Sequence, residues 1–160
     1  MTAFFILLIL YTVIMNIHIA TDHAGFDMKE LLKQYLINNH HQVTDHGAFS
    51  YDADDDYPDY ITPCAQAVAG DTQSLGIILG GSGQGEQITA NKVPGIRTIE
   101  YYGGNLEIVK LGREHNDANI LSLGARFMSA DEALTAVELF LSTDFSGDER
   151  HMRRINKIEK

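Results

Sequence analysis

From Met15 to the C-terminus, short apolar segments that favour β-strands alternate with longer segments that favour helices. This alternation with short connections is typical of a parallel sheet that has helices on both of its faces. We expect strands near residues 15–20, 42–46, 74–79, 96–100 and 118–123. We expect helices near residues 25–39, 57–69, 84–91, 103–113 and 130–141, and a basic helix near 146–158. The pattern therefore predicts a single α/β domain over residues 15–160.

Length and charge narrow the class of protein. A chain of 160 residues is long enough to bury the core of one domain and too short for two comfortable ones. The formal net charge of −10 argues against a nucleic-acid partner, although five of the 12 Lys and Arg residues gather in residues 150–160. The single cysteine, Cys64, excludes an intramolecular disulfide and a cysteine-based zinc site, and it favours a reducing, cytoplasmic location.

Residues 3–14 form an almost unbroken apolar run ahead of the first expected strand. The run is shorter than the roughly 20 residues that span a membrane. No Lys or Arg precedes it and no small-residue cleavage site follows it, so it is a poor secretory signal. We interpret residues 1–14 as an extension from an upstream start codon, with Met15 as the natural first residue. Membrane association and an extra packed strand or helix stay open as alternatives.

A glycine-rich turn follows the third expected strand. The apolar run Leu75–Leu79 leads into Gly80–Glu86, where five of the seven residues are Gly or Ser. Backbone N–H groups at such a strand–helix junction favour anions, and a carboxylate beside them suits proton abstraction next to a carbonyl. Glu86 stands where a dinucleotide-binding GxGxxG motif has its third glycine, which disfavours a nucleotide cofactor. A turn without a ligand, and a Glu86 that only caps the helix, stay open.

Ligands of open α/β sheets bind beyond the carboxyl ends of the strands, so we collect the polar segments expected there. These segments are residues 21–25, 54–59, 80–86, 113–117 and 124–126. Each has a plainer interpretation as well. Asp22 could be a helix cap and His115 a surface histidine, while the acidic run Asp54–Asp56 could be a solvated turn or a metal site. The gathering of several such segments at one edge favours a functional site.

Four segments together resemble one known family. Residues 22–26 (DHAGF), 56–60 (DYPDY), 90–97 (ANKVPGIR) and 113–119 (REHNDAN) are similar to the sugar-phosphate isomerase family of ribose-5-phosphate isomerase B and the galactose-6-phosphate isomerase subunits. Residues 123–126 and 150–155 also fit, so the resemblance covers essentially all of residues 15–160. It implies a three-layer α/β/α sandwich, Rossmann-like, with five parallel strands in the order 2-1-3-5-4. It further implies a homodimer or homotetramer whose active sites are completed across the dimer interface.

One position departs from the commonest pattern of that family. Many members carry a cysteine base just after the third strand, where this chain has Gly80. Cys64 cannot replace that base, because it is expected in the middle of a helix well before the strand. The Gly-Gly-Ser-Gly-x-Gly-Glu-Gln form resembles the actinobacterial branch, in which a glutamate takes over as base. The corresponding residue here is Glu86.

The resemblance also implies roles for individual residues. Glu86 would move a proton between C2 and C1 of the open sugar through a cis-enediolate. His115 would open the sugar ring, with Asp22 holding or relaying protons from substrate hydroxyls. The developing oxyanion would be stabilised by the loop amides, with help from two side chains: Gly81, Gly83, Gly85, Ser82 and Asn116.

The phosphate is expected to bind to arginines. Arg126 would act together with Arg150 and Arg154, the latter two from a partner chain, because guanidinium groups match phosphate oxygens. The remaining expected contacts are His23 and His151 as phosphate or hydroxyl ligands and Tyr57 as a wall against the sugar. The resemblance implies neither a metal nor a cofactor.

These roles predict an aldose–ketose isomerase that interconverts ribose 5-phosphate and ribulose 5-phosphate. An isomerase with the same chemistry on a four-carbon or a hexose phosphate is the first alternative. A non-catalytic sugar-phosphate binder or inactive partner subunit is the second, and retention of Glu86 and His115 argues against it. The expected partners are a sugar phosphate and a second copy of the chain, with no nucleic acid and no membrane.

Overall fold

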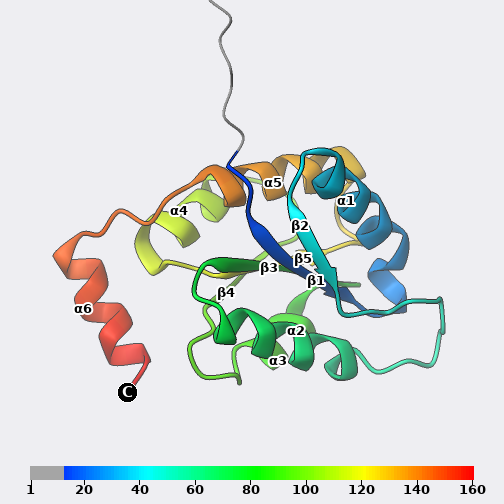
Figure 1. Cartoon of the computed structure of the whole chain (residues 1–160), viewed down its shortest axis with the longest axis horizontal. Helices are drawn as coiled ribbons and strands as arrows, with labels where there is room; N and C mark the ends of the chain where they lie inside the picture. The colour runs from blue at the N-terminus through cyan, green and yellow to red at the C-terminus, as the bar shows by residue number, and fades with distance from the viewer. Residues whose placement is uncertain (1–12) are drawn as a thin grey trace, which may run out of the picture.

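Five parallel strands form the centre of the protein, and helices cover both faces of this sheet in a computed structural model that describes residues 13–160 (Figure 1). The strands are β1 (Asn16–Thr21), β2 (Gln42–Asp45), β3 (Ser74–Gly80), β4 (Thr98–Tyr101) and β5 (Ile120–Gly124). Their order across the sheet is β2-β1-β3-β5-β4, and every neighbouring pair is parallel. The predicted fold class and strand order are therefore confirmed.

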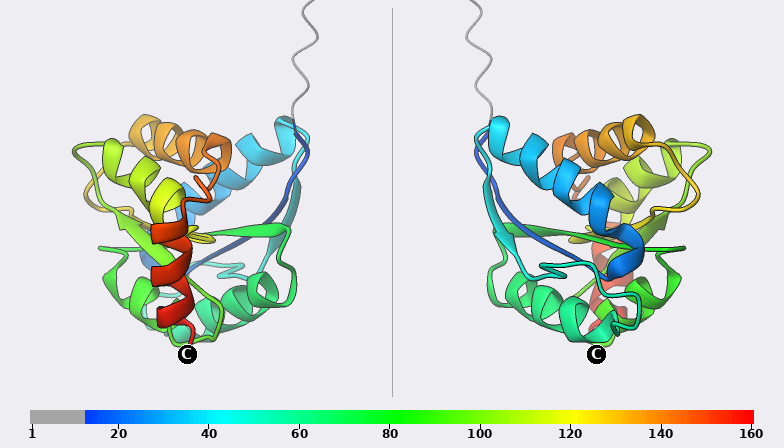
Figure 2. Two further views of the ribbon diagram at one scale, coloured as in Figure 1. Left: turned by 90° about the vertical axis from the view of Figure 1, so that its left-hand side faces the viewer. Right: turned by 90° about the vertical axis from the view of Figure 1, so that its right-hand side faces the viewer.

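Two layers of helices sandwich the sheet, as the two side views show (Figure 2). The helices are α1 (Phe26–Asn38), α2 (Pro58–Gly70), α3 (Gln84–Ala90), α4 (Glu107–Asn116), α5 (Ala130–Ser142) and α6 (Glu149–Ile158), and a short 3₁₀ turn, η1 (His23–Gly25), precedes α1. One core cluster joins α1, α4 and α5 to one face, and a second joins α2 and α3 to the other. The central strand β3 is apolar almost throughout because both of its faces are covered.

The expected element boundaries hold to within a few residues, except at the fourth helix. The sequence pattern predicts this helix over residues 103–113, whereas α4 covers Glu107–Asn116. Gly103 and Gly104 have φ angles of +103° and +95°, and this left-handed backbone cannot belong to a right-handed helix. The two glycines therefore form the turn after β4, and the helix begins beyond them.

The two ends of the described chain lie away from the sheet core. Val13 and Ile14 are exposed and precede β1, and the rest of the expected N-terminal extension, residues 1–12, lies outside the described residues. Within residues 13–160, no helix combines the length and the apolar composition that crossing a membrane requires. At the other end, α6 packs against α4 on the side of the molecule opposite the start of α1 (Figure 1).

All strands run in the same direction, so the sheet has one side where the strands end and an opposite side where they begin, and both matter for the site. At one, which we call the carboxyl edge, β1, β3 and β5 end side by side, with Gly80 paired to Gly124 and Thr21 to Leu79. At the other, the amino edge, β4 and β5 begin, and the backbone N–H of Asn119 donates to the carbonyl of Arg97 there. The loops of the carboxyl edge carry the glycine-rich turn.

Candidate active site

The glycine-rich loop is fixed against the end of β5. Gly83 caps α3 in a left-handed conformation, with φ of +84°, and its carbonyl accepts a 2.7 Å hydrogen bond from Oγ of Ser122. A Cβ on Gly83 would lie 3.0 Å from the backbone carbon of Leu123, so the loop approaches β5 more closely than a side chain allows. Ser82 is partly buried, and its Oγ accepts from the backbone N–H of Gln84 at 3.4 Å. The amides of this loop are therefore held in place before any ligand binds.

Glu86 lies in the first turn of α3 and is only 4% exposed. Its carboxyl group occupies the space beside Gly80, where a Cβ would be 2.0 Å from Cδ and Oε1 of Glu86. Only glycine at position 80 leaves room for the carboxyl group in this position. Burial raises the pKa of Glu86 above its usual range, and the nearby charges of Asp22 and Glu100 raise it further. The arrangement gives a buried carboxyl group with increased basicity.

Asp22 and His23 follow β1 at the same edge. Asp22 is 7% exposed, and its Oδ1 accepts from the backbone N–H of Ala24 at 2.9 Å, so the helix-cap interpretation is correct as far as η1 is concerned. Nδ1 of His23 lies 2.6 Å from Oδ1 of Asp55. This hydrogen bond is the main reason why the pKa of His23 is raised. His23 also lines a cavity of about 360 Å³ between the start of α1 and residues 125–130.

The acidic run between β2 and α2 is thus not a uniformly solvated turn. Asp54 and Asp56 are exposed, whereas the side chain of Asp55 is only 4% exposed. Asp22, His23 and Asp55 could offer metal-ligand atoms within 4.8 Å of one another. The 2.6 Å contact between His23 and Asp55 is, however, the length of a hydrogen bond, and it engages one atom of each residue.

Tyr57 and Arg126 contact the glycine-rich loop from its two sides. A Cβ on Gly85 would lie 2.7 Å from the hydroxyl oxygen of Tyr57, so the phenol ring covers that glycine. A Cβ on Gly81 would lie 3.3 Å from Nη1 of Arg126, and the backbone N–H of Arg126 donates to the carbonyl of Gly81 at 3.1 Å. The guanidinium group of Arg126 is exposed beside the loop, where an anion could bind it.

His115 and Asn116 lie at the amino edge, not with the residues above. A helix that follows a parallel strand runs back along the sheet, so α4 ends where β5 begins. β5 separates this point from the glycine-rich loop by on the order of 15 Å, at about 3.3 Å per residue. The expectation that residues 113–117 reach the carboxyl edge of their own chain is therefore wrong.

Helix α6 shares the amino edge with His115. The imidazole ring of His151 stacks on that of His115, with 4.3 Å between centroids and 12° between planes. His151 is buried, whereas Arg150 and Arg154 are exposed on α6. The predicted site residues thus form two groups in one chain. The carboxyl-edge group is Asp22, His23, Tyr57, Gly81, Ser82, Gly83, Gly85, Glu86 and Arg126, and the amino-edge group is His115, Asn116, Arg150, His151 and Arg154.

Two residues beside the site escape the sequence prediction. Asp55 is hidden in a run of acids that looks solvated as a whole, and its place just before the DYPDY segment is the one available signal. Glu100 lies in β4, its Oε1 is buried without a hydrogen-bond partner among the described residues, and burial raises its pKa. A lone Glu in a short strand gives no sequence signal of this kind.

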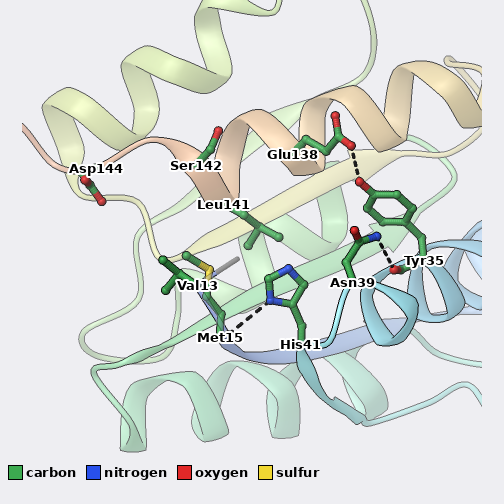
Figure 3. A pocket seen from close by; sticks show the side chains of 9 residues that line it. All are labelled: Val13, Met15, Tyr35, Asn39, His41, Glu138, Leu141, Ser142 and Asp144. Atoms are coloured by element: carbon green, nitrogen blue, oxygen red, sulfur yellow. Dashed lines mark hydrogen bonds between the residues drawn. The ribbon is translucent and has the colours of Figure 1, made fainter. Parts of the chain in front are cut away.

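A cavity of about 520 Å³ opens away from the candidate site, where β1 begins (Figure 3). It lies between the end of α1 and the end of α5, and His41 accepts a 3.3 Å hydrogen bond there from the backbone N–H of Met15. None of the residues that the sequence predicts for the site lines this cavity. Despite its size, this cavity is therefore not the candidate active site.

Comparison with known proteins identifies the family of the chain. Residues 17–158 match the family model described as Ribose/Galactose Isomerase. The chain belongs to this family. Ribose-5-phosphate isomerase B of Mycolicibacterium paratuberculosis is 46% identical over 142 residues, which cover 89% of this chain and 88% of the relative.

Solved structures of family members have the same fold. A ribose 5-phosphate isomerase from Thermotoga maritima superposes with a TM-score of 0.84 at 42% identity, covering 91% of this chain and 97% of its own. Ribose-5-phosphate isomerase B of Mycoplasma genitalium, solved with bound ribulose 5-phosphate, has a TM-score of 0.86 at 37% identity, covering 91% of this chain and 94% of its own.

Proposed function

We propose that this protein is an aldose–ketose isomerase that interconverts ribose 5-phosphate and ribulose 5-phosphate. Membership of the ribose/galactose isomerase family supports the reaction class, and relatives with 46% and 42% identity carry the name of this activity. The observation that carries the mechanism is the buried carboxyl group of Glu86 in the space that Gly80 leaves open. It combines raised basicity with a fixed position beside the loop amides.

In the proposed reaction the sugar ring is opened first. His115 of a second copy of the chain and Asp22 exchange protons there with the ring oxygen and the anomeric hydroxyl. Glu86 then removes the proton from C2 of the aldehyde, and the electrons of that bond form a C1–C2 double bond while charge moves onto O1. The amides of the glycine-rich loop and Ser82 stabilise this cis-enediolate, together with Asn116 of a second copy of the chain. Return of that proton to C1 and transfer of the O2 proton to O1 give the ketose, so no external oxidant or reductant is required.

We infer that each complete site is shared between two copies of the chain. His115, Arg150 and Arg154 lie at the amino edge, on the order of 15 Å from Glu86, too far to act on the same sugar within one chain. In a homodimer, His115, Arg150 and Arg154 of one copy would meet Glu86 and Arg126 of the other. Exposed aromatic rings beside Arg126, those of Tyr102 and Phe127, provide apolar surface for such an interface.

The expected substrate is an anionic small molecule. The five basic residues of 150–160 would attract it, whereas the chain as a whole has a net charge of −10. We expect no nucleic-acid partner, no membrane partner and no metal or cofactor. A cytoplasmic location fits the single, buried cysteine.

The first test replaces the base. Glu86→Gln keeps the size of the side chain and removes its basicity, so kcat for ribose 5-phosphate should fall by at least about 1,000-fold while the substrate still binds. Glu107→Gln is the matched control, since Glu107 is an exposed acid in the first turn of α4. A Glu86→Gln protein that retains more than a tenth of the wild-type kcat would contradict the assignment.

A second test asks whether two chains share a site. Glu86→Gln chains and Arg150→Ala/Arg154→Ala chains, each nearly inactive alone, should regain activity when they form mixed dimers. Each mixed dimer contains one site in which all of these residues are intact. Absence of activity in purified mixed dimers would show that the phosphate is bound within one chain.

The sugar itself is tested by comparing kcat/KM on four substrates: ribose 5-phosphate, erythrose 4-phosphate, allose 6-phosphate and galactose 6-phosphate. The proposal requires the highest value for ribose 5-phosphate. A higher value for another of these sugars would change the substrate and keep the mechanism. Tight binding of all four without turnover would identify a sugar-phosphate-binding subunit instead.

A further inference from the structure

The loop between β2 and α2 places one buried carboxylate against His23. The side chain of Asp55 is 4% exposed, although it lies in a run of otherwise exposed acids. Its Oδ1 receives two hydrogen bonds from the same residue, one from Nδ1 of His23 at 2.6 Å and one from the backbone N–H of His23 at 3.2 Å. Asp55 therefore fixes both the backbone and the ring of His23.

The second carboxylate oxygen makes this contact unusual. Oδ2 of Asp55 is buried and has no hydrogen-bond partner in the part of the chain that the structure describes. A buried carboxylate is expensive unless it is paired with a cation or well supplied with donors. His23 provides the only pairing of Asp55 within residues 13–160, so the cost of burying Asp55 is offset chiefly by this residue.

The charges around His23 favour its protonated ring. The hydrogen bond to Asp55 raises the pKa of His23 most, the negative charges of Asp22 and Asp55 add to it, and the positive charge of Arg126 opposes it. Oδ2 of Asp22 lies 3.8 Å from Nδ1 of His23, and the ring of Tyr51 meets the imidazole edge-on at 6.0 Å. With Nδ1 engaged by Asp55, Nε2 is the ring atom left for a ligand.

We propose that Asp55 is a positioning residue, which holds His23 by its Nδ1–H so that Nε2 of the ring faces the bound sugar phosphate. The location supports this role because His23 follows β1 at the carboxyl edge, where the charges of Asp22 and Arg126 act on its ring. His23 also lines a cavity of about 360 Å³ between α1 and residues 125–130. An imidazolium held there is a fixed donor for a phosphate or hydroxyl oxygen. The inference rests on the proposed function only in naming a sugar phosphate as the ligand.

The same contact bears on Tyr57. Only Asp56 separates Asp55 from Tyr57, whose phenol ring covers Gly85 on the glycine-rich loop. The hydrogen bonds of Asp55 thus attach the β2–α2 loop to the end of β1. This attachment lies close in sequence to Tyr57, the expected wall of the site. Loss of Asp55 should affect substrate binding more than the proton transfer at Glu86.

The primary experiment measures the tautomer and the pKa of the His23 ring in the protein without substrate. In ¹⁵N–¹H NMR spectra, the wild-type ring should carry its proton on Nδ1 when neutral, and its pKa should lie above the usual 6.5. Asp55→Asn should lower that pKa, whereas Asp54→Asn, an exposed neighbour in the same loop, should leave it unchanged. A wild-type ring protonated on Nε2 when neutral, or a pKa insensitive to Asp55→Asn, would overturn the proposal whether or not the protein is an isomerase.

Kinetics supply the second readout. Asp55→Asn should raise KM for ribose 5-phosphate about tenfold, the size expected for one charge-assisted hydrogen bond, and should change kcat less than about threefold. His23→Gln should have a similar effect, and adding Asp55→Asn to it should change KM by less than about twofold. Independent effects of the two substitutions would show that Asp55 does not act through His23.

Two controls complete the design. Circular dichroism of Asp55→Asn identifies a folding failure, in which case Asp55→Ser and the wild-type NMR reading decide the question. Chelation by EDTA and addition of Mg²⁺ or Zn²⁺ test the metal alternative for Asp22, His23 and Asp55. A metal-dependent wild-type activity that Asp55→Asn abolishes would replace the positioning role with a metal site.

Discussion

A substitution at Gly80, which contacts the carboxyl group of Glu86, should reduce kcat without a comparable loss in the free energy of unfolding. In Gly80→Ala the new Cβ would lie 2.0 Å from Cδ and Oε1 of Glu86 and 2.3 Å from Oε2. Non-bonded carbon atoms rest at about 3.5–4.0 Å, so the carboxyl group must withdraw by about 1.5 Å. A misplacement of about 1 Å can reduce turnover roughly 100-fold, so kcat should fall by at least about that factor.

Stability should change little in the same variant. The group that has to move is the end of a flexible side chain, and Gly80 does not have a positive φ, so alanine fits the backbone. Replacing glycine by alanine also reduces the freedom of the unfolded chain, which stabilises by about 0.4–1 kcal/mol where the backbone is compatible. The free energy of unfolding should therefore stay within about 1 kcal/mol of the wild-type value.

The assay combines steady-state kinetics on ribose 5-phosphate with urea unfolding of the same samples. Gly70→Ala is the matched control, since a Cβ there meets nothing within 4 Å, and its kcat should equal that of the wild type. A Gly80→Ala protein that keeps more than a tenth of the wild-type kcat would refute the link between this glycine and the base. A loss of more than about 3 kcal/mol in stability would show that the glycine is required for folding instead.

Three further expectations concern other parts of the chain. Burial raises the pKa of the Cys64 thiol well above its usual range, so thiol reagents should not inhibit the folded protein, and Cys64→Ala should keep kcat while losing about 1 kcal/mol of stability in urea unfolding. Burial lowers the pKa of His18 and of His46, which hydrogen-bond each other at 2.9 Å, so stability should be full above about pH 6.5 and should fall as acidification charges both rings. Urea unfolding across pH 5–8 should show this loss, and His46→Gln should reduce it; equal pH dependence in the two proteins would contradict the explanation. A chain that begins at Met15 should keep isomerase activity, because β1 begins at Asn16, and a loss of folding in that chain would show that the preceding residues belong to the domain.

The sequence by itself predicts most of the fold. Apolar runs and helical segments are local patterns, so their alternation places all five strands and all six helices that the structure has within residues 13–160. The family resemblance supplies the strand order, which no local pattern contains. The expected fourth helix begins too early because it includes Gly103 and Gly104, whose left-handed backbone forms the turn after β4.

Tertiary structure decides which predicted residues can act together. Glu86 is identifiable from its motif, but its dependence on Gly80 appears only when α3 folds back over the end of β3. His115 is identifiable too, yet the return of α4 along the sheet places it at the opposite edge from Glu86. Asp55 looks solvated in sequence and is buried because the β2–α2 loop meets His23. The physical reason is the same in each case: composition and periodicity are properties of neighbouring residues, whereas burial and distance depend on which distant segments the sheet brings together.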